Sequence, residues 1–242
     1  MKFAQFSLRT LCVMALSLPG FAWAGSVTGK VAFEGQAPEM KPVSLSADAA
    51  CAAMHKDKPV LSEVLVLGEG QAMANVMVAV TGGIPQKEFP QPTEPVVLSQ
   101  KGCRYEPHVF GIRVGQTLKV LNPDGILHNV HSTPKTNTAL NKAMPKDMTE
   151  IETRFDKPEE LFPFKCDIHP WMQAYCAVFA HPFFSVTASD GKFEISGLDP
   201  GEYEITAWHE RLGAKKAKVT VAADGAATLD FVFSRAGAGT GK

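Results

Sequence analysis

The chain has 242 residues, with 24 Lys and Arg against 25 Asp and Glu and a formal net charge of −1 at pH 7. Apolar residues make up 45% of it, which is enough for the cores of one or two ordinary domains. The sequence has no basic stripe, so nucleic acid is excluded as an expected partner.

The first 24 residues have the pattern of a cleaved export signal. Lys2 and Arg9 precede a short apolar run at 11–18, and the sequence A-W-A at 22–24 offers a cleavage site before Gly25. The run is much shorter than the roughly 20 apolar residues of a membrane-spanning helix, and no later stretch is long and apolar enough. We therefore expect a periplasmic protein without a membrane span. From Gly25 it would carry 22 basic and 25 acidic residues and a formal net charge of −3.

Strand patterns dominate the remainder, and the best helical candidate is one short turn near 47–54. Short apolar runs bounded by Gly, Pro and Asp predict strands at 27–33, 75–80, 109–120 (two strands split at Gly115), 161–166, 175–179, 183–187, 192–195, 203–208, 217–221 and 228–233. Residues 82–95 are typical of a Pro-rich linker, and residues 133–147 of a polar loop. Many short strands with 20 Gly and 17 Pro predict an all-β sandwich or barrel.

The segment F-K-C-D-I-H-P-W-M (164–172) combines Cys166, His169 and Met172 at spacings of three residues. Copper that cycles between Cu(I) and Cu(II) is held by two imidazoles and one thiolate in a plane, with a weak axial thioether. One short loop can supply three of these donors, and the fourth must come from another strand. His128 is the candidate, because it follows the strand at 117–121 and the turn after it.

Two patterns in this region carry a family resemblance. G-Q-x-L-x-V-x-N-x-D…H-N-V (115–130), followed by F-x-C-x-x-H-P-x-M (164–172), resembles the cupredoxin family of plastocyanin, pseudoazurin and amicyanin. The spacing of the ligand loop is closest to that of amicyanin. The resemblance implies a Greek-key cupredoxin sandwich over residues 91–180 and one mononuclear type 1 copper site.

The family's ligands carry over one by one to His128, Cys166, His169 and, as the axial ligand, Met172. The resemblance also implies that Asn129 steadies the ligand loop by hydrogen bonding. It makes the loop imidazole the ligand nearest the surface and thus the electron exit. The adjacent Pro-Trp pair at 170–171 would then form an apolar contact patch for a transient redox partner protein.

Each of these residues alone is more often structural: a buried cysteine, a satisfied histidine or a core methionine. Other metal sites fit the combination less well. Zinc has little use for a thioether, and a binuclear copper site would need two cysteines in the ligand loop. Multicopper oxidases need His-x-His pairs and c-type haem needs C-x-x-C-H, and the sequence contains neither.

Two further histidines have open roles. His131 is out of step with His128 in strict strand alternation, and His108 begins the strand that opens the cupredoxin pattern. Either could be an additional ligand or a proton-linked neighbour, and either could equally face away from the metal.

Four cysteines lie outside the expected export signal, which allows three pairings in an oxidising compartment. Cys51 and Cys103 are the best disulfide candidates, because both precede strands outside the ligand loop. Cys176 is expected as a buried free thiol. A bond between Cys166 and Cys176 would abolish the proposed metal site.

The C-terminal part carries a second resemblance. D-G-x-F-x-I-x-G-L-x-P-G-x-Y-x-I, starting at Asp190, resembles the carboxypeptidase regulatory-like domain, a small transthyretin-like β-sandwich. The usual opening of that domain, G-x-V (29–31) and N-V-x-V-x-V (75–80), lies at the other end of the chain.

The two resemblances together predict a discontinuous domain, residues 25–90 plus 181–235, around the inserted cupredoxin. A signal peptide at 1–24 and a flexible tail at 236–242 complete the organisation. Composite chains of this kind resemble some methylamine-utilisation or plastocyanin-like proteins.

The sequence predicts one-electron transfer by a periplasmic blue copper protein, which turns over no substrate and is not an enzyme. The first alternative is a copper carrier or storage protein with the same ligands. Whether His169 is exposed or is covered by the loop at 133–147 would discriminate the two. The second alternative is a carbohydrate- or protein-binding module without a redox role. Metal-assisted catalysis would require His108 and His131 to turn inward.

Overall fold

The computed structural model describes residues 25–223 and 225–235, so the expected signal peptide and tail lie outside the described residues. The strands are β1 (Gly25–Glu34), β2 (Met77–Gly82), β3 (Val96–Ser99), β4 (Val109–Arg113), β5 (Leu118–Leu121), β6 (His128–Ser132), β7 (Asn141–Met144), β8 (Glu150–Thr153), β9 (Glu159–Lys165), β10 (Gln173–Phe179), β11 (Phe184–Val186), β12 (Lys192–Leu198), β13 (Gly201–His209), β14 (Gly213–Val221), β15 (Ala226–Thr228) and β16 (Phe231–Ser234). One α-helix, α1 (Ala49–Met54), and one short 3-10 turn, η1 (Glu69–Gln71), complete the described elements. The predicted all-β fold is therefore confirmed, and no helix among these residues is long and apolar enough to cross a membrane.

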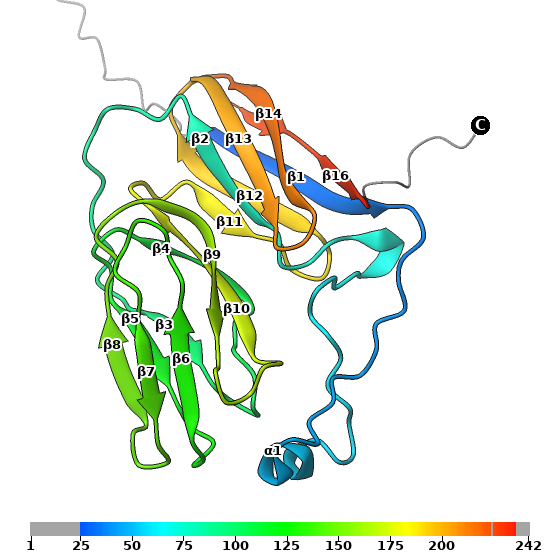
Figure 1. The fold of residues 1–242 in the computed structure, drawn as a ribbon. Coiled ribbons are helices and arrows are strands. Elements are labelled where there is room, and N and C mark those ends of the chain that lie inside the picture. Colours follow the sequence, from blue (N-terminus) through cyan, green and yellow to red (C-terminus); the bar gives the residue numbers. More distant parts are fainter. Residues whose placement is uncertain (1–24, 224, 236–242) are drawn as a thin grey trace, which may run out of the picture.

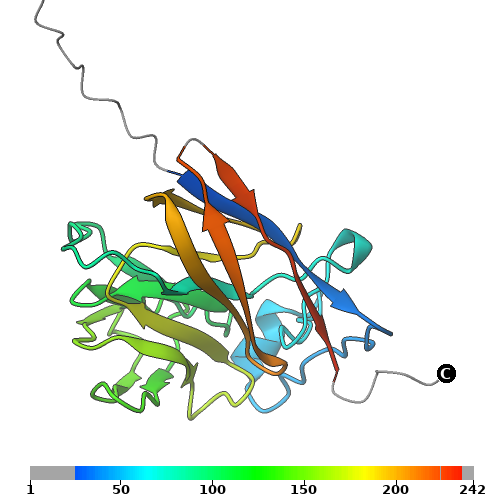
Figure 2. The same ribbon diagram turned by 90° about the horizontal axis from the view of Figure 1, so that it is seen from above.

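The strands form four stacked sheets, seen as an upper and a lower sandwich in Figure 1 and from above in Figure 2. The outer sheet of the upper sandwich has the order β12-β1-β15, with β16 also paired to β1, and its inner sheet has the order β11-β2-β13-β14. The lower sandwich consists of β4-β10-β9-β6-β7 and β3-β5-β8. Three apolar cores fill the spaces between successive sheets.

The two inner sheets are held together by strands that are buried on both faces. In β2, Val78 and Val80 point into the upper core, while Met77 and Ala79 pack against β4 and β10. In β10, Cys176 and its alternate neighbours face the lower core, and the intervening residues face β2. Continuous apolar runs in these strands are thus explained by burial from both sides.

The upper sandwich is built from strands at the two ends of the described sequence. β1 pairs with β12, β15 and β16, and β2 pairs with β11 and β13, whereas β3 to β10 pair among themselves in the described structure. Residues 43–60 depart from the predicted division, because Val43, Leu45 and Val60 pack into the lower core. Figure 1 shows α1, which lies in this segment, at the lower end of the molecule. The exact domain boundaries stay a prediction.

Two local features of the fold differ in how well the sequence predicts them. Gly29, inside the predicted strand at 27–33, is a point of close approach, since a Cβ there would overlap the carbonyl oxygen of Leu229. The predicted polar loop at 133–147, in contrast, contains the strand β7, which pairs with β6. β7 buries only Met144 of its four residues, so it lacks the alternating pattern that announces a strand.

The turn before β7 is organised by one carboxylate at the start of β9. Glu159 accepts hydrogen bonds from the backbone N–H groups of Lys135, Thr136 and Asn137 and from the side chains of Thr136 and Asn137. Burial raises the pKa of Glu159, but these donors outweigh it and lower the pKa to about 2.

We expect the Glu159→Gln variant to be less stable than the wild type by about 1 kcal/mol near neutral pH, because hydrogen bonds to a charged acceptor are lost at a partly exposed site. The ionised form is favoured in the folded state, so this difference is full above the ordinary pKa of 4.5 and disappears as the pH falls towards about 2. Urea unfolding at several pH values measures it. The adjacent, exposed Glu160→Gln is the control, and equal pH profiles for both variants would contradict the assignment.

Candidate metal centre

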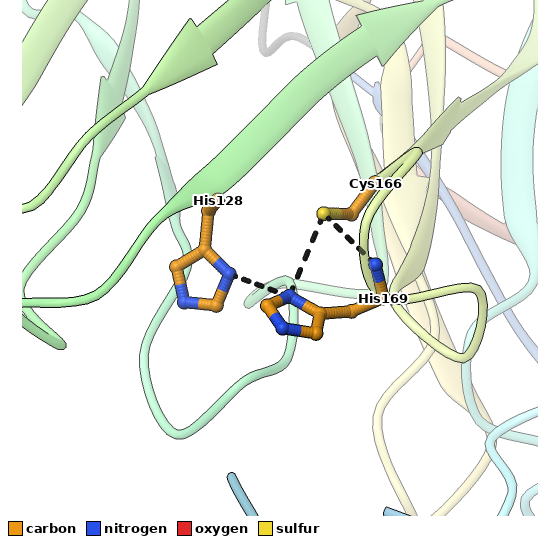
Figure 3. A group of neighbouring side chains, drawn as sticks. All are labelled: His128, Cys166 and His169. Carbon is orange, nitrogen blue, oxygen red and sulfur yellow. Dashed lines mark hydrogen bonds between the residues drawn. The ribbon is translucent and has the colours of Figure 1, made fainter. Parts of the chain in front are cut away.

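Three of the four predicted ligands converge at one end of the lower sandwich. Figure 3 shows His128 on β6 and Cys166 and His169 on the loop between β9 and β10, with both rings and the sulfur turned towards one another. The Nδ1 atoms of the two imidazoles are 3.0 Å apart, and the Cys166 sulfur is 3.7 Å from His169 Nδ1. His169 and Cys166 follow His128 by 41 and 38 residues in the sequence, yet all three side chains share one pocket.

The fourth predicted ligand, Met172, closes the same loop. Its backbone N–H donates to the carbonyl of His169 (2.9 Å), and its own carbonyl accepts from the N–H of Cys166 (3.2 Å). Met172 is 1% exposed and belongs to the same apolar core as Cys166, which is 2% exposed. The short spacing therefore folds into a tight turn that buries both sulfur-bearing residues.

The surroundings of the Cys166 sulfur favour its thiolate form. It accepts hydrogen bonds from the backbone N–H groups of Asn129 (3.3 Å) and His169 (3.4 Å). Burial raises the pKa of the thiol, but His128 and these backbone donors outweigh it and hold the pKa below its ordinary value. A thiolate is the form of cysteine that binds metals.

Each imidazole is held in its orientation by a carboxylate that contacts its Nε2 atom. His128 Nε2 lies 3.0 Å from Asp124, and His169 Nε2 lies 3.4 Å from Asp48, which leaves both Nδ1 atoms facing Cys166. Burial lowers the pKa of His128, but Asp124 and Cys166 raise it above its ordinary value. Burial, together with the charge of His128, lowers the pKa of His169 despite Asp48. A carboxylate behind a histidine is the usual support of a metal-binding imidazole.

Sequence reasoning missed both carboxylates. Asp124 lies in the quoted N-x-D pattern four residues before His128, so a local signal existed in the sequence. Asp48 had none for this role, because it lies 121 residues from His169 and reaches it only through the tertiary fold.

The loop imidazole, expected as the ligand nearest the surface and the electron exit, is covered in the structure. His169 is only 2% exposed, because the segment carrying α1 covers it. Asp48, the N-cap of α1, and Cys51 both contact its Nε2. A disulfide between Cys51 and Cys103 (Cα–Cα 5.7 Å) ties this cover to the lower sandwich. The cover is thus α1, not the segment at 133–147.

Asn129 connects the strand and the loop that supply the ligands. Its side-chain oxygen accepts from the N–H of Asp167 (3.2 Å), and its amide donates to Asn141 (2.9 Å). The buried hydroxyl of Tyr105 donates to the carbonyls of Asn129 (2.6 Å) and Lys165 (3.1 Å), again joining β6 to β9. These bonds fix the ligand geometry from both sides.

The two histidines whose roles the sequence left open, His131 and His108, lie away from the metal centre. His131 Nδ1 lies 2.8 Å from the carboxylate of Asp167, on the other face of β6 from His128. His108 Nε2 lies 2.8 Å from Glu210 of the upper sandwich, and its Nδ1 lies 3.8 Å from Glu63. Neither histidine contributes to a metal-ligand cluster found among the described residues, so the inward turn required for catalysis is not observed.

The remaining cysteine is separate from the site. Cys176 is free and fully buried in the lower core, as expected from the sequence, and Cys166 is free as well. Burial raises the pKa of Cys176 well above its ordinary value, so this thiol stays protonated at neutral pH.

The kinds of ligand atom in the pocket indicate which metal it suits. One thiolate and two imidazoles, with a methionine closing the same loop, match the ligands of mononuclear copper. Zinc would take the first three donors but usually adds a fourth cysteine, histidine or carboxylate. The two nearby carboxylates are instead hydrogen-bonded to the outer nitrogens of the imidazoles. The residues therefore fit copper.

No protein-family model and no curated protein matches the chain. Among solved structures, a Cu(I) amicyanin variant shares 20% identity over 42% of this chain and 98% of its own, with a TM-score of 0.32. An oxidised amicyanin variant gives 20% identity, the same coverage and a TM-score of 0.31. The copper-containing nitrite reductase from Thermus scotoductus SA-01 gives 21% identity over 42% of this chain and 25% of its own, with a TM-score of 0.32.

We expect Tyr105→Phe to lower the free energy of unfolding by about 1–2 kcal/mol, since it removes a buried hydroxyl that donates to the carbonyls of Asn129 and Lys165. The matched control is Tyr175→Phe, whose hydroxyl makes a long, exposed bond to Gln173 (3.4 Å). Denaturant unfolding of the two variants measures the difference. Equal stabilities would show that the Tyr105 hydroxyl does not join β6 to β9.

Proposed function

We propose that this chain is a copper protein with one mononuclear type 1 site and that it transfers single electrons. The observation that carries the proposal is the convergence, in a buried pocket, of one cysteine sulfur and two carboxylate-oriented imidazoles, with the pKa of the cysteine lowered by His128 and backbone donors. Copper, when bound, supplies one-electron cycling between Cu(I) and Cu(II).

The residues of this chain would hold the ion and keep its surroundings fixed. His128 and His169 would supply two imidazoles, Cys166 a thiolate and Met172 a thioether. The pocket excludes water, since His128 is fully buried and His169 nearly so. A rigid, dry ligand set suits electron transfer, because neither oxidation state then requires the protein to rearrange.

The proposal includes a setting outside the cytoplasm. The export-signal pattern at 1–24 and the disulfide between Cys51 and Cys103 both support an oxidising compartment such as the periplasm. A transient redox protein would be the partner, and no substrate would be turned over.

The burial of His169 favours a second candidate, a periplasmic copper carrier or storage protein with the same ligands. A covered ligand does not offer its ring directly to a partner. A route to the surface is Trp171, whose ring centroid lies 5.1 Å from that of His169 and which is only half-buried. Its indole N–H donates to the carbonyl of Cys103 (3.0 Å), which holds the ring in place. Electron transfer would therefore pass through Trp171.

The copper assignment is tested by adding Cu(II) to the chain from Gly25 and recording its visible spectrum. We expect an intense thiolate-to-copper charge-transfer band that is absent in Cys166→Ala. The matched variant Cys176→Ala, which removes the other free cysteine, should retain the band. A wild type without the band, or a Cys166→Ala variant with it, would contradict the site.

The two candidate functions are separated by the rate at which ferricyanide oxidises the Cu(I)-loaded protein. If Trp171 is the exit, Trp171→Leu slows oxidation severalfold, whereas Trp208→Leu, at the half-buried tryptophan of β13, does not. Equal rates in both variants, with slow oxidation of the wild type, would favour the carrier.

A further inference from the structure

The disulfide lies directly against the candidate copper ligands. The Cys51 sulfur is 3.7 Å from His169 Nε2, the nitrogen that faces away from Cys166. Metal-binding atoms of Asp48, Cys51 and His169 lie within 4.8 Å of one another, and the same is true of Cys103, Asp124 and His128. Both halves of the disulfide therefore have a copper-ligand imidazole as a neighbour.

The two cysteines of the disulfide have similar surroundings. The backbone N–H of Cys51 donates to Asp48 (2.9 Å), and that of Cys103 donates to Asp124 (2.8 Å). Each of these carboxylates also contacts the outer nitrogen of an imidazole. Each cysteine thus carries its own carboxylate and imidazole, and the bond between the sulfurs joins the two sets.

We propose that the dithiol form of Cys51 and Cys103 is a second Cu(I) site beside the first. Two neighbouring thiolates are soft donors of the kind that Cu(I) prefers. Asp124 holds the backbone of Cys103, and Asp48, the N-cap of the helix that carries Cys51, contacts His169. Both sulfurs therefore stay at the pocket when the bond between them is broken. The inference deepens the proposed function, since it makes the amount of bound copper depend on the thiol state of the same pocket.

The interconversion is a balanced thiol–disulfide exchange. One thiol of a dithiol reductant attacks a sulfur of the disulfide and forms a mixed disulfide, and the second thiol then displaces the chain's cysteine. Two electrons and two protons pass to Cys51 and Cys103, and the reductant becomes a disulfide. When Cu(I) binds, the two thiols release their protons to solvent.

The same bond also fastens the cover. Cys51 belongs to α1, and Asp48 at the start of this helix is one of the groups that bury His169. Breaking the disulfide removes the covalent tie between α1 and the lower sandwich. The contact of Asp48 with His169 remains after reduction, so α1 stays in place and the two thiols lie side by side as the second site.

Copper stoichiometry tests the proposal. The chain from Gly25 is prepared oxidised, and also reduced by a phosphine in denaturant, refolded and desalted without oxygen. Thiol titration in denaturant should find two free thiols in the first form and four in the second. Each form then competes for Cu(I) with a chromogenic chelator. We expect the oxidised chain to withdraw one equivalent of Cu(I) and the reduced chain two.

Two variants locate the additional ion. Cys51→Ser/Cys103→Ser, treated with the same reductant, should withdraw one equivalent, whereas reduced Cys176→Ser should still withdraw two. A reduced wild type that withdraws no more Cu(I) than the oxidised one overturns the proposal, and this comparison does not require the double variant to fold. So does loss of the additional ion in Cys176→Ser.

The proposed function can fail separately. If the oxidised chain withdraws no Cu(I) and shows no charge-transfer band, the type 1 site is refuted. The dithiol site still stands if the reduced wild type withdraws one equivalent and the reduced double variant withdraws none.

Discussion

The hydrogen bond from the Asn129 N–H to the Cys166 sulfur joins the two parts of the chain on which the site depends. It connects β6, which carries His128, to the turn that carries the other ligands. The surrounding bonds of Asn129 and Tyr105 repeat this connection. Since the donor to Cys166 is backbone, its position follows from the strand itself, and the ligands are placed by the sandwich more than by their own side-chain contacts.

Burial on both faces makes the support of this site rigid. β10 begins directly after the ligand loop and packs against the lower core on one side and against β2 on the other. The upper sandwich also reaches towards the loop through Glu210, which contacts His108. The upper sandwich therefore supports the strand from which the loop departs, and α1 covers His169.

Sequence predicted the parts of this structure that are encoded locally. The spacing of Cys166, His169 and Met172 and the H-N-V strand are short patterns, and the structure brings His128, Cys166 and His169 together. The cover could not be predicted, because Asp48 meets His169 only through contacts between distant segments. The strand β7 was missed for a different reason, since its polar residues are specified by pairing with β6 and not by a burial pattern of their own.

X-ray absorption at the copper edge of the Cu(II)-loaded, oxidised chain tests the central claim most directly, because it counts the atoms bound to the ion. The account predicts one short copper–sulfur bond and two copper–imidazole bonds, with the sulfur lost in Cys166→Ala. Coordination by nitrogen and oxygen alone in the wild type would contradict it and would leave the pocket without the thiolate on which the proposed electron transfer depends.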